Sequence, residues 1–254
     1  MLKFSAIIPT YNREKFLIKS ITSVLKQSHK PCEIIVIDDA NSFETEKIIK
    51  EFIEKNLNIK FIYLSNKKNK GALYSRNYGS TFSTGEYLAF LDDDDVWDKN
   101  YLKKANDHLM EKNYDILISK IVSIKLNGST EDKLIPNIFS IEDYLFGNPG
   151  VLCSNVIIKK SCFEDLEGYD KKISGAADKD LFIRACLKNY KYVVLNDNKI
   201  FYQIHDNQWS DDYKKIFFQK LYFFLKYIKY YLSFKKLYKI FKLLLYYLYL
   251  SLRK

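Results

Sequence analysis

The sequence predicts an α/β domain built on an open, mostly parallel twisted sheet that is flanked by helices. Three observations predict it. Apolar runs of strand length alternate with segments of helical periodicity through the first 91 residues. These runs are continuously apolar, which suits strands covered on both faces. Acidic residues directly follow two of the runs, at the edge where open α/β sheets bind their ligands.

The first half of the chain supplies four expected strands and the helices between them. The first strand, at residues 3–8, is stopped by Pro9, and Asn12 is placed to cap the next helix. The elements that follow are a strand at 33–37, a helix at about 44–55, a strand at 59–64, a helix that opens near Gly71, and a strand at 87–91. This alternation is typical of a doubly wound sheet.

The pattern is less regular after about residue 113. We expect a strand at 114–124 and a helix at 177–187. Two short strands are expected at 192–195 and 200–204, and a turn at 148–150. The chain shows no internal repeat and no low-complexity linker.

The charge distribution separates the last 42 residues from the rest. The net charge is +10, but residues 1–212 carry 30 Lys and Arg against 31 Asp and Glu. Residues 213–254 carry 11 basic residues, no acidic ones, and 15 of the 41 aromatic residues. We therefore expect a domain at 1–212 with halves at 1–112 and 113–212, followed by a basic, aromatic, helical tail at 213–254.

The composition excludes several classes of protein. A hydrophobic fraction of 47% supports a packed core, which excludes wholesale disorder and fibrous architectures. The four cysteines are scattered without a C-x-x-C pair, which excludes a disulfide framework and a cysteine zinc site. The N-terminus has no signal-peptide layout. We therefore expect a cytoplasmic protein.

Four adjacent aspartates that end the fourth expected strand are the most unusual feature. Their carboxylates repel one another unless a cation is present, and hard oxygen ligands on a short loop suit Mg²⁺ or Mn²⁺. Alternate residues of an extended segment point the same way, so Asp92 and Asp94, or Asp93 and Asp95, would converge. Their position, level with the acidic pair that ends the second strand, favours a cation site over a solvated acidic loop.

The chain has no glycine-rich phosphate loop of the G-x-G-x-x-G or G-x-x-x-x-G-K-[ST] kind. A diphosphate would then be held by a metal ion and by side chains, as expected for a leaving group.

Five segments resemble those of the family-two inverting glycosyltransferases with the GT-A fold. They are SAIIPTYNR (5–13), IIVIDD (34–39), GALYSRN (71–77), FLDDDDVW (90–97) and ADKDLFIR (177–184).

The resemblance implies that the nucleotide lies at the ends of the first two strands. A phenol ring stacks on a base, and a carboxylate accepts the N–H of a base. The alternatives are turn packing for Tyr11 and a surface ion pair for Arg76. The residues assigned in this way to the nucleotide are Pro9, Thr10, Tyr11, Asn12, Asp38, Asp39, Arg76, Asp92 and Asp93.

The resemblance also implies a bound Mn²⁺ or Mg²⁺. Asp94 is the expected metal ligand, and Asp92 or Asp93 would contact the ribose or the metal shell. His205 matches a late segment that closes over the diphosphate, where an imidazole ligates the metal or donates to phosphate; the alternative is an ordinary surface histidine. Asp95 is expected to cap the following helix, and Trp97 to lie in the core or in the wall of the acceptor site.

Asp178 matches the general base of the family. The base takes the proton of an acceptor hydroxyl on the face opposite the departing diphosphate, so that one displacement inverts the anomeric carbon. The family often has an acidic residue just before this position, where this chain has Ala177. Asp180 is therefore the competing base.

The tail has apolar residues at helical spacing with lysines between them. Its longest uncharged stretch, 243–252, has ten residues, against the roughly 20 needed to span a bilayer. Basic residues with interleaved aromatics suit a helix on an anionic membrane surface, so one hypothesis is a peripheral membrane anchor. The alternatives are a dimer interface and a helical cover on the domain. No nucleic-acid motif is present, so we expect no nucleic-acid partner.

The resemblance implies a metal-dependent glycosyltransferase of the hexosyltransferase type. It would move a sugar from a nucleotide sugar, a UDP-sugar by preference, to a hydroxyl of a glycan or lipid-linked acceptor. The implied setting is bacterial surface polysaccharide or lipooligosaccharide synthesis at the inner face of the cell membrane. The alternatives are a sugar-phosphate nucleotidyltransferase on a related fold and a non-catalytic membrane-interaction protein.

Overall fold

The structure is a computed structural model that describes residues 1–204, 213–231 and 234–252. Its first half alternates strands and helices, as the apolar runs predict. In chain order these elements are β1 (Phe4–Thr10), α1 (Glu14–Leu25), β2 (Glu33–Asp38), α2 (Phe43–Lys55), β3 (Lys60–Ser65), α3 (Ala72–Thr81), β4 (Tyr87–Phe90), β5 (Val96–Trp97) and α4 (Tyr101–Glu111).

The second half combines short elements with two long strands and the helices α7, α8 and α9. They are β6 (Ile116–Ile124), β7 (Thr130–Lys133), α5 (Ile141–Phe146), β8 (Val156–Lys159), α6 (Lys160–Asp165), α7 (Ala177–Leu187), β9 (Tyr192–Gln203), α8 (Tyr213–Lys226) and α9 (Phe234–Leu252). Three-residue 3₁₀ turns precede β8 and α7, and another 3₁₀ turn, Ile228–Tyr231, follows α8.

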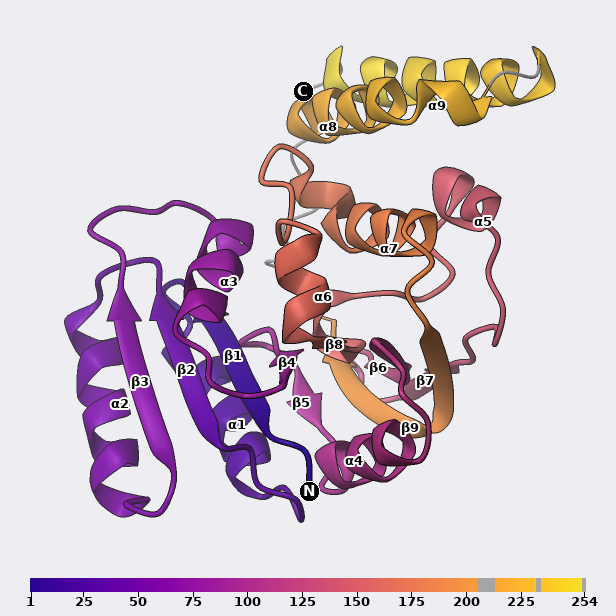
Figure 1. Cartoon of the computed structure of the whole chain (residues 1–254). Helices are drawn as coiled ribbons and strands as arrows, with labels where there is room; N and C mark the ends of the chain where they lie inside the picture. Colours follow the sequence, from indigo (N-terminus) through magenta and orange to yellow (C-terminus); the bar gives the residue numbers. More distant parts are fainter. Residues whose placement is uncertain (205–212, 232–233, 253–254) are drawn as a thin grey trace.

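The described strands form one nine-stranded sheet in the order β3-β2-β1-β4-β8-β6-β9-β5, with β7 paired to β6. β1, β2, β3 and β4 run parallel, and β8 enters antiparallel between β4 and β6. The predicted α/β class is confirmed, with a parallel first half and a mixed second half. The carboxyl ends of β1, β2 and β4 lie along one edge of the sheet (Figure 1).

Both faces of the sheet are buried, which explains the continuous apolar runs. Ile7 faces a core with α3, α5, α6, α7 and α8, while Ala6 and Ile8 face a core with α1, α2 and α4. On α1 the buried apolar residues Leu17 and Ile21 recur at helical spacing and lie against the second of these cores. The two layers of helices hold the strand ends in place.

Two sequence-based expectations about local structure were wrong. Asn12 does not cap α1: it has a left-handed φ of 53°, which asparagine tolerates, and Arg13 occupies the cap position without a side-chain cap. The two short strands expected at 192–195 and 200–204 form the single strand β9. The pairing with β6 jumps between Ser119 and Lys120, so three extra residues of β9 bulge out and interrupt the sequence pattern.

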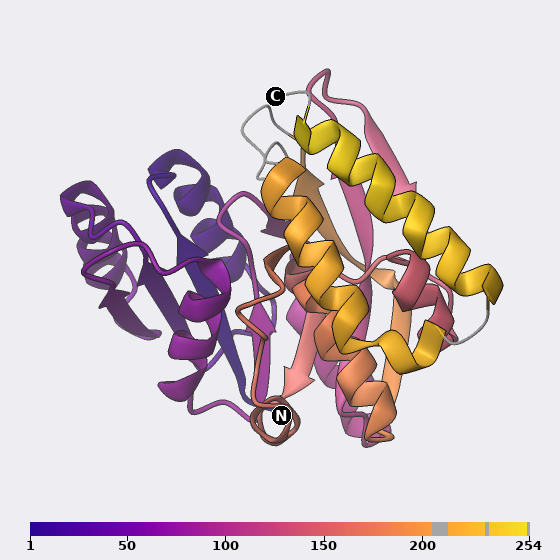
Figure 2. The same cartoon turned by 90° about the horizontal axis from the view of Figure 1, so that it is seen from above.

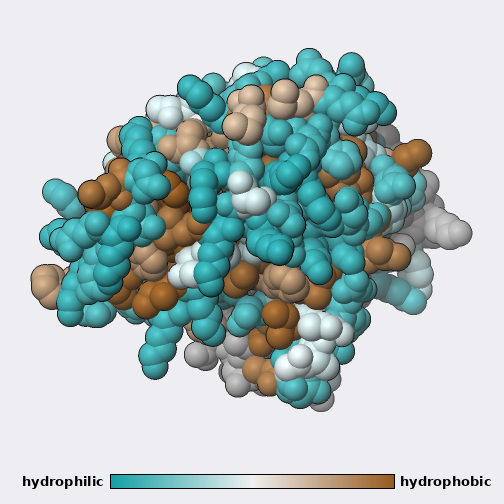
Figure 3. Space-filling model, turned by 90° about the horizontal axis from the view of Figure 1, so that it is seen from below, coloured by the Kyte–Doolittle hydropathy of each residue, from teal (hydrophilic) through white to brown (hydrophobic). Residues whose placement is uncertain are grey.

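The first helix of the tail lies on the domain. Phe223, Tyr227 and Tyr231 are at most 5% exposed and belong to the same core as α7. α9 packs beside α8 (Figure 2), and its Ile240 joins the same core. Both helices lie on the side to which the carboxyl ends of β1, β2 and β3 point (Figure 1). The opposite face carries mostly hydrophilic side chains (Figure 3). Among the described helices, none has the length and apolar character needed to cross a bilayer.

Candidate functional site

The four aspartates lie directly beyond β4, at the carboxyl edge of the sheet. The backbone N–H of Leu91 still bonds to the carbonyl of Ile7 at 3.0 Å, so the loop begins at Asp92. The N–H of Asp95 then donates to the carbonyl of Asp92 at 3.1 Å, which closes a turn. This turn, and not the alternation of an extended segment, decides which carboxylates meet.

Three of the four carboxylates converge. Asp92, Asp94 and Asp95 each offer an oxygen within 4.8 Å of the others. The expectation that Asp95 caps the following helix was wrong, because Asn100 is the residue that precedes α4. A carboxylate oxygen of Asp95 instead accepts from the backbone N–H of Gln203 at 3.4 Å. The predicted pair Asp92 and Asp94 is thus joined by a third carboxylate that the sequence assigned elsewhere.

The electrostatics of this group fit a cation. Burial raises the pKa of Asp95 well above its usual range, and the charges of Asp92 and Asp94 raise it further. Burial also raises the pKa of Asp93 to about 6, against a hydrogen bond from Thr10. Buried carboxylates that repel one another are stabilised by a divalent ion, and an all-oxygen set suits Mg²⁺ or Mn²⁺. The other expected ligand, His205, lies outside the described residues.

Two arginines face the acidic loop. Nη1 of Arg13 lies 2.7 Å from Oδ2 of Asp94 and 3.4 Å from Oδ1 of Asp93. Arg76 is 5% exposed and donates from Nη2 to Oδ1 of Asp92. Its Nε has no hydrogen-bond partner among the described residues. The two guanidinium groups partly offset the negative charge of the loop and put hydrogen-bond donors beside it.

The first loop is anchored to the acidic loop. Thr10, at the end of β1, donates from its hydroxyl to Oδ2 of Asp93 at 2.7 Å, and both residues are buried. Pro9 lies inside β1 opposite Ile37. Beyond them the side chain of Tyr11 is 47% exposed. The structure therefore places Thr10 and Asp93 in the framework of the edge and leaves Tyr11 accessible for stacking.

The acidic pair after β2 organises the neighbouring loops. Asp38 is fully buried and accepts from the backbone N–H groups of Ala40 and Ser42 at 2.9 and 2.7 Å, and from the hydroxyl of Tyr63 at 2.9 Å. These bonds are those of a structural residue at the start of α2.

Asp39 holds the loop that leads into α3. Its carboxylate accepts from the backbone N–H groups of Lys70 and Gly71 at 2.9 and 2.7 Å and from the amide of Asn66 at 2.8 Å. Asp39 is thus already bonded to protein donors, whereas the sequence assigned its carboxylate to a nucleotide base.

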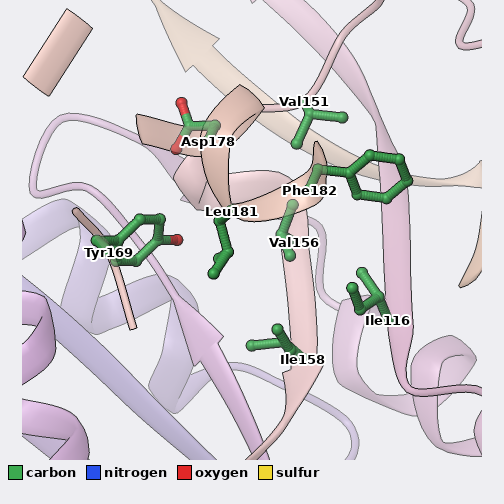
Figure 4. A pocket seen from close by; sticks show the side chains of 8 residues that line it. All are labelled: Ile116, Val151, Val156, Ile158, Tyr169, Asp178, Leu181 and Phe182. Carbon is green, nitrogen blue, oxygen red and sulfur yellow. The ribbon is translucent and has the colours of Figure 1, made fainter. Parts of the chain in front are cut away.

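Asp178 lies in the first turn of α7, close to the acidic loop. The thiol of Cys153 lies 2.7 Å from its Oδ1. The apolar surroundings raise the pKa of Asp178 to about 6, although the Cys153 hydrogen bond and the charge of Arg76 favour the ionised form. Asp178 borders a small cavity whose other lining side chains are apolar or aromatic, Leu181 and Phe182 among them (Figure 4). A carboxylate of this kind suits a general base near neutral pH.

Asp180, the competing base, faces another direction. It is fully buried, and Arg184 donates to its Oδ2 at 2.8 Å. Its other oxygen bonds to Lys226 and Tyr227 of the tail, at 2.6 and 2.7 Å. With both oxygens held by protein donors, Asp180 has the environment of a structural ion pair. The geometry therefore favours Asp178.

Several residues of the site were not singled out from the sequence. Cys153 and Ser154 sit in a 3₁₀ turn before β8, and the hydroxyl of Ser154 accepts from the N–H of Asp92 at 3.0 Å. Asn77 gives both amide atoms to the backbone of Tyr169, at 2.8 and 2.9 Å, and so fixes α3 to the second half. Their roles depend on contacts with residues far away in the sequence, which no local sequence pattern predicts. Trp97 is 2% exposed and lies in the core.

A comparison with known families matches residues 5–165 to the family described as Glycosyl transferase family 2. A protein of *Methanocaldococcus jannaschii* described as an uncharacterized glycosyltransferase is 33% identical over 227 residues, which is 86% of this chain and 76% of that protein. The *Escherichia coli* UDP-Glc:alpha-D-GlcNAc-diphosphoundecaprenol beta-1,3-glucosyltransferase WfgD is 31% identical over 62% of this chain and 60% of its own length.

Solved structures share the fold. *Staphylococcus aureus* TarS, residues 1–349, in complex with UDP-GlcNAc, aligns with a TM-score of 0.66 at 20% identity over 94% of this chain and 78% of that one. The mannosyltransferase PcManGT of *Pyrobaculum calidifontis*, in complex with GDP-Man and Mn²⁺, aligns with a TM-score of 0.69 at 16% identity over 90% of this chain and 64% of that one. At these identities the likeness shows the fold, which is that of the GT-A transferases.

Proposed function

Because the chain belongs to glycosyl transferase family 2, and is therefore a glycosyltransferase, we propose that it is a metal-dependent inverting enzyme. Its donor is a nucleotide sugar, a UDP-sugar by preference. The observation that carries this proposal is the meeting of two carboxylate environments at one edge of the sheet. Three carboxylates converge there, those of Asp92, Asp94 and Asp95. Asp178 lies close enough that the charges of Arg76 and Asp92 shift its pKa.

The acidic loop is the proposed donor site. Asp92, Asp94 and Asp95 would hold Mn²⁺ or Mg²⁺, which when bound offsets the negative charge that develops on the diphosphate. Arg13 and Arg76 supply further positive charge at the same loop. Tyr11 offers an exposed ring for the base. Asp39 and Asp93 are bonded to protein donors, so in this proposal they act on the nucleotide indirectly, by holding the neighbouring loops in place.

Asp178 is the proposed base. Its carboxylate accepts the proton of the acceptor hydroxyl while the hydroxyl oxygen forms the new glycosidic bond and the nucleoside diphosphate leaves with the electrons of the old one. The thiol of Cys153 stays protonated, because burial raises its pKa, and fixes one oxygen of Asp178. Attack opposite the leaving group gives inversion.

A donor screen tests the proposal. We expect UDP-sugars with Mn²⁺ to raise the melting temperature of the protein, because a ligand at 100 times its Kd stabilises the folded state by about 2.7 kcal/mol. GDP- and dTDP-sugars serve as controls for the base, and UDP-sugar with EDTA as the control for the metal. Release of pyrophosphate from a nucleoside triphosphate and a sugar phosphate, with no UDP-sugar binding, would indicate a nucleotidyltransferase instead.

The proposed acceptor is a glycan or a lipid-linked saccharide in bacterial surface polysaccharide synthesis, met by the enzyme in the cytoplasm at the inner face of the membrane. The outer face of α9 supports this proposal. Tyr238, Phe241, Leu245 and Tyr249 repeat at helical spacing and are 54%, 60%, 47% and 50% exposed. The tail carries no acidic residue, so the same helix attracts anionic lipid.

Substituting serine for Phe241 and Leu245 together is expected to weaken binding to vesicles that contain phosphatidylglycerol by about tenfold or more, since each apolar side chain contributes on the order of 1 kcal/mol at an interface. Co-sedimentation measures it. The matched control replaces Phe43 and Leu57, which are 80% and 85% exposed on and after α2. Equal binding by the two double variants would contradict the membrane contact.

A further inference from the structure

The buried carboxylate of Asp180 ties the catalytic domain to the tail. Lys226 of α8 lies 2.6 Å from Oδ1 of Asp180 and 2.8 Å from Oδ2 of Asp170. The hydroxyl of Tyr227 donates to the same Oδ1 at 2.7 Å. Asp180 is fully buried, whereas Lys226 and Asp170 are about one quarter exposed. Among the bonds described above, Asp180 has one partner outside the tail, which is Arg184 of α7 itself.

A second bond joins the tail to the segment before α7. The side-chain carbonyl of Gln219, in α8, accepts from the backbone N–H of Gly175 at 2.9 Å. Gln219 is 8% exposed, so the accepting side of this bond is buried, whereas Gly175 is exposed. Gly175 belongs to the 3₁₀ turn Ser174–Ala176, which leads directly into α7.

These contacts lie on either side of Asp178. Gly175 comes three residues before it and Asp180 two residues after it, and both are bonded to α8. The backbone of this first turn sets the direction in which Asp178 reaches toward Cys153 and Arg76. Packing supports the same link, because Phe223 and Tyr227 are buried in the core that contains Leu181.

We propose that α8 positions the base, with Lys226 and Gln219 as positioning residues for Asp178. This inference rests on the proposed function, in which Asp178 is the base. It gives α8 a role in the catalytic domain through its buried face, apart from the exposed apolar residues of α9 that are proposed to meet a membrane. Removing residues 213–254 would therefore affect both catalysis and membrane binding, so point variants are needed to separate the two.

Replacing Lys226 with methionine is expected to lower kcat about 10- to 100-fold, the loss that follows when a reacting group is misplaced by a small distance. KM for the donor and the Kd for UDP with Mn²⁺ are expected to stay unchanged, because the acidic loop is untouched. Lys226→Arg retains the positive charge and should recover most of the activity. Lys229→Met, an exposed lysine three positions on, is the matched control and should behave as wild type.

Gln219→Ala provides a second variant that leaves the buried ion pair intact, and the same split between kcat and KM is expected. Hydrogen exchange of the amides of residues 175–180 gives a readout that does not depend on turnover, and it should rise in both variants. A lower melting temperature with wild-type kcat per folded molecule would overturn the inference and make α8 a structural cover. If the wild-type protein shows no transferase activity, the proposed function is contradicted. If hydrogen exchange at residues 175–180 still rises in both variants, the coupling of α8 to α7 is supported all the same.

Discussion

Asparagine at position 178 is expected to lower kcat by about 10²–10⁴-fold, the contribution of a positioned general base. The substitution keeps the shape of the side chain and the contact with Cys153 but removes the ability to accept a proton. Binding of UDP with Mn²⁺ should persist, because the acidic loop is unchanged. Transfer kinetics together with calorimetric titration of UDP measure both effects.

The pH profile checks the same assignment. Burial raises the pKa of Asp178 to about 6, so the base is increasingly protonated as the pH falls through that value, and the rate should fall with it. The residual rate of Asp178→Asn should lose this acid limb. Asp165→Asn, at an exposed carboxylate of α6 that pairs with Lys188, is the control. Unchanged transfer by Asp178→Asn would assign the base elsewhere.

Alanine at position 94 is expected to abolish metal-dependent binding of UDP and to reduce turnover by about 10²-fold or more. Asp94 is one of three converging carboxylates, and a bound divalent ion contributes several kcal/mol of charge stabilisation, each 1.36 kcal/mol being a factor of ten in rate. Titration of UDP with Mn²⁺ and with EDTA separates the metal effect from folding.

The ion pair between Arg13 and Asp94 gives this variant a second expected effect. Because the guanidinium of Arg13 pairs with Asp94, the alanine variant also removes one of the two carboxylates beside Arg13 and leaves Asp93 as the other. Metal-independent binding of UDP is therefore expected to persist or increase while the Mn²⁺ dependence disappears. Asp107→Ala, at an exposed carboxylate of α4, is the matched control. Full Mn²⁺-dependent activity in Asp94→Ala would reject the metal assignment.

The parallel half of the fold and the gathering of the candidate residues at one sheet edge were predictable from the sequence because both depend on local pattern. Continuous apolar runs predict strands covered on both faces, and ligand residues follow such strands. The acidic loop and the residues after β1 and β2 were expected at this edge, and they lie there.

The details depend on backbone geometry that the pattern does not contain. The turn between the carbonyl of Asp92 and the N–H of Asp95 brings Asp95 into the carboxylate group, although alternation paired it with Asp93. The bulge in β9 divides one strand into two apparent ones. Lys226 and Lys229 are alike in the sequence, and only tertiary packing distinguishes the ion-pair partner of buried Asp180 from an exposed lysine.

The clamp between Asn77 and Tyr169 has a consequence for how substrates reach the site. Gly168, with φ of 66°, lies so close to Asn77 that an added Cβ would stand 2.7 Å from its Oδ1, which leaves no room for adjustment at this junction. The pairing of β4 with β8 and the Asn77–Tyr169 bonds both join the two halves, so a hinge rotation between the halves would have to break both. If the proposed function holds, we therefore expect donor entry and nucleotide exit to depend on local rearrangement near the acidic loop.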